Sequence, residues 1–384
     1  ARRAAFPALR RRGMKRERLH RADSAQLHSA ASARLHSAAI ALLEGAQTPA
    51  QAARAAGFDN ASTFSQACEK RFGLTPQDLR GIPAAGSYRF RYGGPMHLPQ
   101  LLAYLGRDPH NLSEQLRGNC LRRHFPLDGR PVPVTLTFEE KSCEVKVGRR
   151  LRPAQTLELH GMLRHFLGLD QPLHKFYRLV RGHPVMGPLI KPLRGVRIAQ
   201  VPTLWEALSW AVMGQQINLS FAYRLRNRLI ELGNGGGRPA GKSRRPLPFP
   251  TPQAVLGISP QLLRENQFSR QKTDYLAIVA RACLEGPLRD LSLDSVSVEE
   301  AEARLLGVKG IGRWTMAYGL MRHLGHVDAL PVGDAGLRAA LRVQFGLSEP
   351  PDVDEQERLM EPFRPYRGLA TYYLWRSKSA SIQE

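Results

Sequence analysis

The spacing of apolar and polar residues divides the chain into regions with different expected secondary structure. The segments VPVTLTFEE (132–140) and CEVKVGR (143–149) alternate with a period of two, which predicts two β-strands. From about residue 190 onward, apolar residues recur at helical spacing, so this part is expected to be almost entirely helical. Residues 23–82 are rich in alanine and also predict helices.

These patterns predict an α+β fold that is mostly α and is organised in four regions. In chain order we expect a basic flexible tail at 1–22, a helical module at 23–82, a small α+β domain with an antiparallel sheet at 86–180, and an all-α domain at 190–384. Within the last region, the stretch GNGGGRPAGKSRRPLPFPTP (233–252) is rich in glycine, proline and basic residues. It therefore predicts a flexible surface loop.

Helix start and stop signals punctuate the alanine-rich module. The expected caps and stops are, in chain order, Thr48, Pro49, Gly57, Ser62, Gly73, Thr75 and Pro76. Phe64 and Phe72 share the inner face of the second helix. Two short helices joined by a tight turn form the helix-turn-helix plan, in which the second helix enters the major groove of DNA. Its outward-facing residues, expected to touch bases or phosphates, are Asn60, Thr63, Gln66 and Lys70.

The stretch TPAQAARAAGFDNASTFSQACEKRFGLTPQDLRG (48–81) resembles the second helix-turn-helix of the AraC/XylS regulators. Those regulators carry two such units, and the first is not legible here. The preceding RADSAQLHSAASARLHSAAIALLEG (21–45) is either a single linker helix or an eroded remnant of the first unit. The resemblance implies a DNA-binding module, while a vestigial or packing role is the alternative.

The net charge of the chain limits the classes of partner that it is expected to bind. It has 56 Lys and Arg against 33 Asp and Glu, a formal net charge of +23. Such an excess of positive charge indicates a polyanionic partner, and the most common polyanion is nucleic acid. The alternative is that the basic residues only form a solvated protein surface. No apolar run approaches the length of about 20 residues that spans a bilayer. Nor does an apolar core follow the basic N-terminal residues, as a signal peptide would require. A bacterial cytoplasmic location at the nucleoid is therefore expected.

The four cysteines are far apart and form no CxxC pair. They are Cys68, Cys120, Cys143 and Cys283. This spacing disfavours zinc fingers and cysteine-ligated iron–sulfur clusters, and fits a reducing compartment. No side-chain metal site is therefore expected.

The short connection GVKGIGRW (307–314) lies between two predicted helices, VSVEEAEARLL and RWTMAYGLMRHL. Glycines in such a connection permit positive φ and the close approach of another backbone. The amide groups at the start of the second helix would then face outward, ready to bind a phosphate. An ordinary tight helical turn is the alternative. Farther on, the loop VDALPVGD contains Asp328 and Asp334, and Asp334 directly precedes a predicted helix, where an N-cap belongs.

This arrangement resembles the helix-hairpin-helix glycosylase superfamily, whose signature is a G-[IV]-G hairpin followed about twenty residues later by an aspartate. The IGRWT-A-Y form looks like DNA-3-methyladenine glycosylase II, the AlkA type. The resemblance extends over about residues 86–384 and implies that Asp334 is the catalytic aspartate, since Asp328 falls too early. It further implies that DNA is bound around the hairpin, by Lys309, Gly310, Gly312, Arg313 and Thr315.

The same resemblance implies further site residues. An apolar stripe at Leu204, Leu208 and Val212 continues at helical spacing to the polar Gln215. The GQQI-S motif places Gln215 at the base pocket and Gln216 as the wedge in the duplex, although a core hydrogen bond is the plainer role for Gln215. The pocket walls implied by the resemblance are Trp314, Tyr318, Trp375 and, at the rim, Tyr104. Such aromatic positions are otherwise typical of a core. A monovalent cation held by hairpin carbonyls is also implied.

Two features indicate a monofunctional enzyme. Bifunctional members of the superfamily carry a lysine nucleophile at the start of the helix after the hairpin, where this chain has Trp314. Members with an iron–sulfur cluster end in four cysteines, whereas no cysteine follows Cys283. We therefore expect a monomeric glycosylase that flips alkylated bases (3-methyladenine, 7-methylguanine) out of double-stranded DNA and hydrolyses the glycosidic bond. The rival hypotheses are a transcriptional regulator or damage sensor without base release, and a noncatalytic structural DNA-binding protein.

Overall fold

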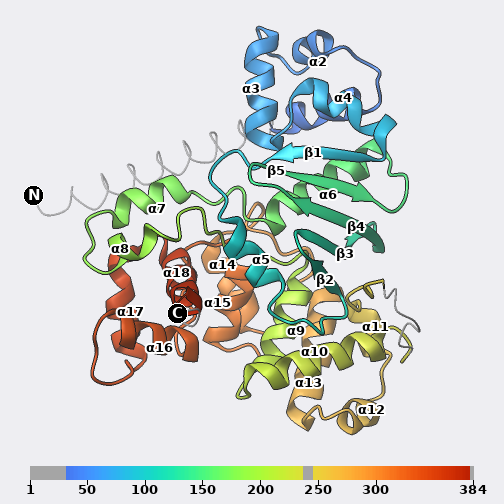
Figure 1. Ribbon diagram of the computed structural model, residues 1–384. Coiled ribbons are helices and arrows are strands. Elements are labelled where there is room, and N and C mark those ends of the chain that lie inside the picture. Colours follow the sequence, from blue (N-terminus) through green and yellow to red (C-terminus); the bar gives the residue numbers. More distant parts are fainter. Residues whose placement is uncertain (1–31, 237–244, 381–384) are drawn as a thin grey trace, which may run out of the picture. The chain divides into compact units, whose positions relative to one another are not determined.

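The computed structural model describes residues 32–236 and 245–380 (Figure 1). The expected basic tail at 1–22 lies outside the described residues. The chain forms two compact units, of which the first, as far as it is described, comprises residues 32–88 and 151–157. The second comprises residues 89–150 together with 158 onward. The fold class inferred from the sequence, mostly α with one small antiparallel sheet, is confirmed.

The first unit is built from short helices with well-formed caps. After a helical stretch at 32–43 come α2 (Pro49–Ala55), α3 (Ala61–Phe72) and α4 (Pro76–Ala85). Thr48 and Thr75 each form a capping box, and Gly73 ends α3 in the left-handed conformation, as expected. Phe64 and Phe72 are buried together on the inner face of α3.

The cap of α3 differs from the prediction. Asn60, not Ser62, is its N-cap: the Asn60 side chain accepts hydrogen bonds from the Thr63 amide at 2.9 Å and from the Thr63 hydroxyl at 2.7 Å. The helix therefore begins two residues earlier than the serine would place it. Asparagine and serine cap equally well, so residue type alone could not decide between them.

The second unit contains the sheet and the remaining helices, except that the first residues of the strand at 87–91 and of the helix at 153–166 belong to the first unit. The strands are β1 (Ser87–Arg91), β2 (Glu114–Arg117), β3 (Cys120–Leu127), β4 (Arg130–Phe138) and β5 (Ser142–Val147). Their order is β1-β5-β4-β3-β2, and the pairs β2–β3, β3–β4 and β4–β5 are antiparallel. Alternate residues of β4 are buried, so the period-two pattern identified this strand and β5 correctly.

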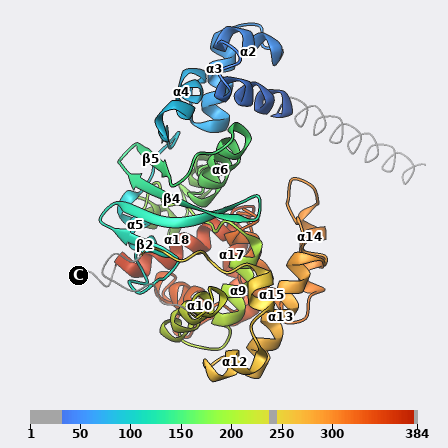
Figure 2. The ribbon, with the colours of Figure 1, turned by 90° about the vertical axis from the view of Figure 1, so that its right-hand side faces the viewer.

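The helical part of this unit is centred on α9 (Leu204–Gly214), whose residues are almost all buried. It packs against α10 (Leu219–Gly233), α13 (Arg270–Leu284) and α15 (Arg313–Arg322), which lie close to it in Figure 2. The other helices are α5 (Leu98–Leu105), α6 (Pro153–Phe166), α7 (Leu173–Val180), α8 (Met186–Ile190), α11 (Pro252–Leu256), α12 (Pro260–Glu265), α14 (Val298–Leu306), α16 (Ala335–Gln344), α17 (Val353–Met360), the 3₁₀ turn η1 (Glu361–Phe363) and α18 (Arg367–Ala380).

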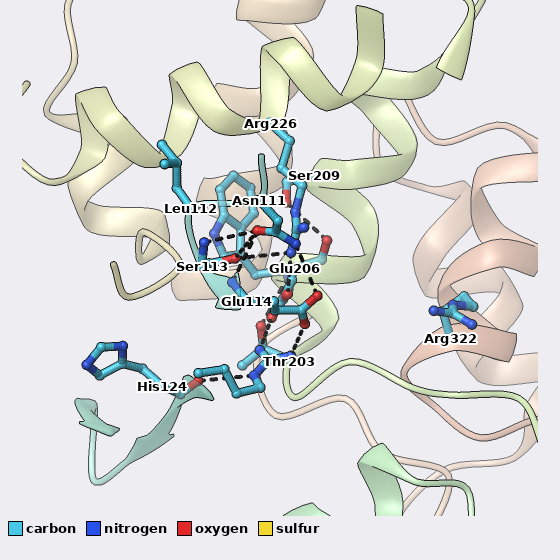
Figure 3. Close-up of polar contacts among 12 residues, drawn as sticks. Asn111, Leu112, Ser113, Glu114, His124, Thr203, Glu206, Ser209, Arg226 and Arg322 are labelled. Atoms are coloured by element: carbon cyan, nitrogen blue, oxygen red, sulfur yellow. Dashed lines mark hydrogen bonds and ion pairs between the residues drawn. The ribbon is translucent and has the colours of Figure 1, made fainter. Parts of the chain in front are cut away.

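A buried ionic network ties the sheet to α9 and α10 (Figure 3). Arg123 of β3 pairs with Glu114 of β2 and, at 3.1 Å, with Glu206 of α9. Glu206 also accepts from Arg226 of α10 at 3.2 Å. Two arginines thus face two glutamates, and all four are almost completely buried. Removing one member would leave a buried charge without its partner, which typically costs about 3–5 kcal/mol.

Part of the loop expected at 233–252 is described, and its C-terminal end is anchored. Residues 237–244 lie outside the described residues. Past them, Pro250 accepts a hydrogen bond from the Trp205 indole at 2.8 Å, and the Leu247 amide donates to the Leu112 carbonyl at 2.7 Å. Residues 234–236 and 245–251 form no helix or strand, as the composition predicted, whereas Gly233 and Pro252 belong to α10 and α11. The composition could not show that Pro250 and Leu247 bond to the core.

Candidate active site

The hairpin between α14 and α15 is a tight turn shaped by one glycine. Gly310 has φ +97°, and a Cβ atom there would lie 2.6 Å from the Tyr275 ring. Only glycine satisfies both conditions. Gly312 does not use the positive φ that a glycine permits: it has φ −92° and ψ 180° and is the N-cap of α15. No side chain caps this helix, so its first amides keep their hydrogen-bonding capacity for a ligand.

Asp334 is the best-defined feature of the site. It is the N-cap of α16, with Oδ1 accepting from the Leu337 amide at 2.7 Å. Oδ1 also accepts from the Trp375 indole, and Oδ2 accepts from the Trp314 indole, each at 3.0 Å. The Asp334 carboxylate therefore caps α16, as predicted, and also accepts a hydrogen bond from each of the two tryptophans. Three donors fix the plane of the carboxylate, and Oδ2 keeps a second acceptor position for a further donor.

A glycine makes room for this arrangement. A Cβ atom on Gly336 would lie 3.0 Å from Oδ1 of Asp334 and 3.2 Å from Nε1 of Trp375. No separate sequence signal marks this requirement, because glycine occurs in the first turn of a helix in many unrelated settings. Its position two residues after a capping aspartate is the only available hint.

Aromatic side chains extend from the carboxylate. The Trp314 and Tyr318 rings are tilted against each other with centroids 5.6 Å apart, as their i, i+4 spacing predicts. Tyr372 contacts Trp375 edge-on at 6.2 Å, and Tyr104 contacts Tyr372 in the same manner at 6.2 Å. The structure thus links Tyr104 to Trp375 through Tyr372, which the sequence analysis did not single out. Trp314, Tyr318, Tyr104 and Trp375 are all half-buried.

Arg322 is a second residue that sequence analysis missed. It is buried, donates to the Tyr104 hydroxyl, and has its guanidinium 4.8 Å from the Tyr104 ring centroid and 5.9 Å from that of Tyr318. No carboxylate in the described ranges pairs with it, and its Nε has no hydrogen-bond partner there. Burial lowers the pKa of Arg322 and raises the pKa of Tyr318.

Gln215 lies at the end of α9, not on it. The helix stops at Gly214, and Gln215 is its C-cap with ψ 127°. Its side-chain amide donates to the Gly310 carbonyl at 3.0 Å and to the Thr315 hydroxyl at 3.1 Å. The expected helical stripe therefore ends one residue early, and Gln215 instead braces the hairpin. The buried Lys272 fixes the same turn, since its amine donates to the carbonyls of Val212 and Gln215 at 3.1 and 2.7 Å.

The expected DNA contacts in this unit differ in accessibility. Gln216 is exposed and has φ +57°, which turns the chain sharply away from α9. Lys309 is exposed on the hairpin, and Arg313 is exposed but pairs with Glu357. The Thr315 side chain is buried against Gln215, so only its backbone amide remains for DNA.

In the first unit, the four residues expected to touch DNA are all exposed. Asn60 and Thr63 bond to each other at the start of α3, so both sit at the N-terminal end of the helix. Gln66 and Lys70 follow on the same helix. Asn60 is partly committed to capping and retains its amide donors for recognition.

The second aspartate of the loop has a structural role. Asp328 is buried and accepts from the Arg367 side chain at 3.0 and 2.6 Å and from its backbone amide at 2.9 Å. This pair anchors the start of α18, which carries Trp375. Across residues 32–236 and 245–380, no three His, Cys, Asp or Glu side chains are grouped so as to hold a metal ion. Nor does any helix in those ranges have the length and apolarity needed to cross a membrane.

The hairpin, the anchored aspartate and the aromatic wall define the helix-hairpin-helix class of base excision proteins. Residues 209–365 match the HhH-GPD superfamily of base excision DNA repair proteins, and residues 11–81 match a helix-turn-helix domain. The chain therefore contains an HhH-GPD domain and a helix-turn-helix domain. Both resemblances inferred from the sequence are confirmed.

Among its relatives is the DNA-3-methyladenine glycosylase of Bacillus subtilis, 28% identical over 72% of this chain and 91% of that protein. A second is the probable bifunctional transcriptional activator/DNA repair enzyme AlkA of Mycobacterium tuberculosis, 26% identical over 84% of this chain and 65% of that protein. The solved 3-methyladenine DNA-glycosylase of Archaeoglobus fulgidus shares the fold, with a TM-score of 0.64 over 76% of this chain and 98% of its own, at 22% identity.

Proposed function

We propose that this protein is a monofunctional DNA glycosylase that removes alkylated bases, of the 3-methyladenine and 7-methylguanine type, in base excision repair. The observation that carries the proposal is the Asp334 carboxylate, held by two indole donors and a helix N-terminal amide. Two relatives are named a DNA-3-methyladenine glycosylase and a probable bifunctional transcriptional activator/DNA repair enzyme, which supports the proposal. We further propose that it works as a monomer on duplex DNA of the bacterial nucleoid.

The proposed reaction is hydrolysis at C1′ of the flipped nucleotide. The bond from C1′ to the base nitrogen breaks, the electron pair leaves with the base, and positive charge develops on the sugar. A fixed carboxylate stabilises that charge and can accept a proton from the attacking water. Oδ2 of Asp334 suits the second task, because it carries one donor where Oδ1 carries two. The products are the free base and an abasic site.

Selectivity is proposed to come from the aromatic walls and from the lesion itself. An alkylated purine is cationic, so it stacks on Trp314, Tyr318 and Trp375 with cation–π attraction of roughly 0.5–2 kcal/mol for each ring. It is also a better leaving group than a normal base. Flipping the base costs a few kcal/mol, and the exposed Gln216 is proposed to fill the vacated space in the duplex.

DNA is proposed to be held at the hairpin by the uncapped amides at the start of α15, with Lys309 adding charge. The resemblance to the superfamily also implies a monovalent cation on the hairpin carbonyls. Two of these carbonyls already accept one hydrogen bond each, Gly310 from Gln215 and Val308 from Ile311. Each oxygen has a second lone pair, so the turn has acceptors to offer. When bound, the cation would supply positive charge beside a DNA phosphate.

The test is release of methylated bases from alkylated duplex DNA, identified by chromatography, for the parent and for Asp334→Asn. The parent should release 3-methyladenine and 7-methylguanine and leave uncut abasic sites, while the variant should bind the duplex without releasing bases. An Asp334→Asn variant as active as the parent would refute the assigned mechanism. Strand cleavage would reveal a lyase nucleophile instead. Tight binding with no release by the parent would favour the regulator or sensor hypothesis.

We propose that the helix-turn-helix module adds DNA affinity through the exposed face of α3. Replacing Gln66 and Lys70 by alanine should weaken binding to DNA while base release from saturating substrate stays unchanged. Equal binding by the variant and the parent would instead support a vestigial role. No feature of the described residues favours a regulator that lacks base release.

A further inference from the structure

A strongly basic cavity that Asp334 does not line lies between α7, α8 and the segments 93–95 and 190–197. Its volume is about 670 Å³, which suits a small ligand or one segment of a larger one. We call it the basic pocket. Its cationic or titratable lining residues are His174, Arg178, Arg181, Lys191, Arg194 and Arg197, and no Asp or Glu lines it. It shares no residue with the proposed active site.

The charges at the mouth of the basic pocket are not neutralised. Arg178, Arg181, Lys191 and Arg194 are exposed, and none of them pairs with a carboxylate in the part of the chain that the structure describes. The carboxylate of Asp170 acts electrostatically on the pocket, but it is already bonded to Arg164 at 2.6 Å. Several like charges around one cavity repel each other, so an anion in that cavity relieves the repulsion.

The inner wall of the pocket holds a buried arginine. Arg197 is 9% exposed, and its guanidinium donates to the carbonyls of Gly168 at 3.0 Å, Leu169 at 3.2 Å and Pro95 at 3.4 Å. Its Nε has no partner in the described residues. Carbonyl groups orient the guanidinium but do not neutralise it, and a buried cation without a counter-charge is costly. An anion in the adjoining cavity would supply the counter-charge that the Arg197 guanidinium lacks and would so stabilise it.

We propose that the basic pocket binds a phosphate group. Guanidinium groups recognise phosphate oxygens in pairs, and the pocket combines three exposed arginines with one that is fixed in place. The phosphate can belong to the DNA backbone or be a free phosphate, and the recognising chemistry is the same. This proposal goes beyond the glycosylase function, because it requires neither a lesion nor Asp334.

Side-chain contacts link the basic pocket to α18, the helix that carries Trp375. Tyr177 lines the pocket under the Arg194 guanidinium, which lies 5.2 Å from the ring centroid. The Tyr177 hydroxyl lies 2.8 Å from that of Tyr373 on α18, and it accepts from the Gly195 amide at 2.8 Å. The pocket therefore adjoins α18 at Tyr373, two residues before Trp375.

The test compares two triple variants of the full chain that lose the same charge. The pocket triple is Arg178→Gln, Arg181→Gln and Lys191→Gln. The control triple is Lys175→Gln, Arg264→Gln and Arg342→Gln, which are exposed, unpaired in the described residues and not part of the pocket lining. Because all six positions are exposed, both proteins should fold, which circular dichroism checks. The probes are an undamaged DNA duplex, titrated over a range of salt concentrations, and inorganic phosphate, followed by phosphorus NMR.

If the pocket holds backbone phosphate, the pocket triple should lower the slope of log affinity against log salt by about 1–2, since each phosphate contact contributes about 0.9. The control triple should leave the slope nearly unchanged. If the pocket takes free phosphate, the parent and the control should broaden the phosphate signal, the pocket triple should not, and DNA binding should be equal in all three. Identical behaviour of the two triples with both probes would overturn the proposal. Undamaged DNA contains no lesion, so the outcome does not depend on glycosylase activity.

Discussion

Replacing Trp375 by phenylalanine tests whether the indole donors position the carboxylate of Asp334, the proposed catalytic group. The change removes the 3.0 Å bond to Oδ1 of Asp334 and leaves the 2.7 Å bond from the Leu337 amide in place. A hydrogen bond to a charged group is worth about 1.5–3 kcal/mol. If that amount is lost in the transition state, the rate of base release falls by about 10- to 150-fold. The smaller ring should cost stability by only about 1–2 kcal/mol.

The assay is single-turnover release of 7-methylguanine from methylated duplex at saturating protein, with binding measured separately. We expect the rate constant to fall while the dissociation constant for the duplex changes by less than about threefold. Trp314→Phe is the matched variant, because it removes the equivalent 3.0 Å bond to Oδ2. Since Oδ2 is the proposed working oxygen, Trp314→Phe should be slower than Trp375→Phe.

The decisive comparison uses Asp334→Asn as a background. If the indole acts through the carboxylate, adding Trp375→Phe to Asp334→Asn should cause little further loss, because the group that it positions is already gone. A full additive loss would mean that Trp375 acts on the base independently of Asp334. A Trp375→Phe variant as fast as the parent would refute the positioning argument altogether.

Three other outcomes follow from the structure. Gly310→Ala should lower the free energy of unfolding by about 2–4 kcal/mol, through the φ of +97° and the 2.6 Å approach to Tyr275, as measured by urea denaturation. Arg322→Met should raise the kcat/KM ratio of 7-methylguanine over neutral hypoxanthine about two- to fivefold, the equivalent of roughly 0.5–1 kcal/mol. The substitution removes the guanidinium that contacts the Tyr104 ring, so the ring becomes free for a cationic base and a repelling charge is lost. Burial lowers the pKa of His323 to about 4, so the unfolded chain binds a proton that the folded chain does not; stability should fall by up to about 3 kcal/mol as pH drops from 6.5 to 4.

The first of these predictions has a matched control, and each has a result that would contradict it. Gly312→Ala should be tolerated, because Gly312 has negative φ and no neighbouring atom lies within 4 Å of the position that a Cβ atom would take. Equal loss in both glycine variants would contradict the account of the turn. A fall in the ratio for Arg322→Met would mean that the arginine does not oppose cationic bases. A pH profile of stability that His323→Asn leaves unchanged would assign the acid sensitivity to other groups.

The sequence predicted the parts of the site that depend on local signals. Asp334 reads as a helix cap, and it is one. Trp314 and Tyr318 share a helix face by their spacing, and their rings do contact. The convergence of Trp314 and Trp375 on the two oxygens of one carboxylate has no local signal, since the tryptophans are 61 positions apart and meet only because α15, α16 and α18 pack around them.

Other parts of the site were not predictable because they contradict the usual behaviour of their residue types. Helical spacing predicted that Gln215 lies on α9, but the helix ends at Gly214. Lys272 donates hydrogen bonds to the carbonyls of Val212 and Gln215 at that helix end. Lysine is usually exposed, so the sequence did not indicate that Lys272 is buried and bonds to these carbonyls. Ser62 and Asn60 are both good caps, and only the backbone of the turn selected Asn60.

The sequence also did not show which of the many arginines are buried. A basic composition suggests a charged surface, yet five arginines of the described chain are buried: Arg123, Arg164, Arg197, Arg226 and Arg322. Three of them pair with carboxylates, as burial of a charge requires. The other two, Arg197 and Arg322, have no carboxylate partner in the described residues and each keeps an unpartnered Nε.

A fold retains an unpaired buried cation only where something offsets its cost. Arg197 borders the basic pocket, where an arriving phosphate would supply the missing negative charge. Arg322 lies behind the Tyr104 and Tyr318 rings, whose electron-rich faces offset part of the cost before any base arrives. The two arginines therefore lead to opposite expectations: an anion should stabilise the surroundings of Arg197, whereas a cationic base must compete with Arg322 for the same rings. Thermal unfolding with added inorganic phosphate separates them, because Arg197→Met should abolish the stabilisation by phosphate and Arg322→Met should leave it intact.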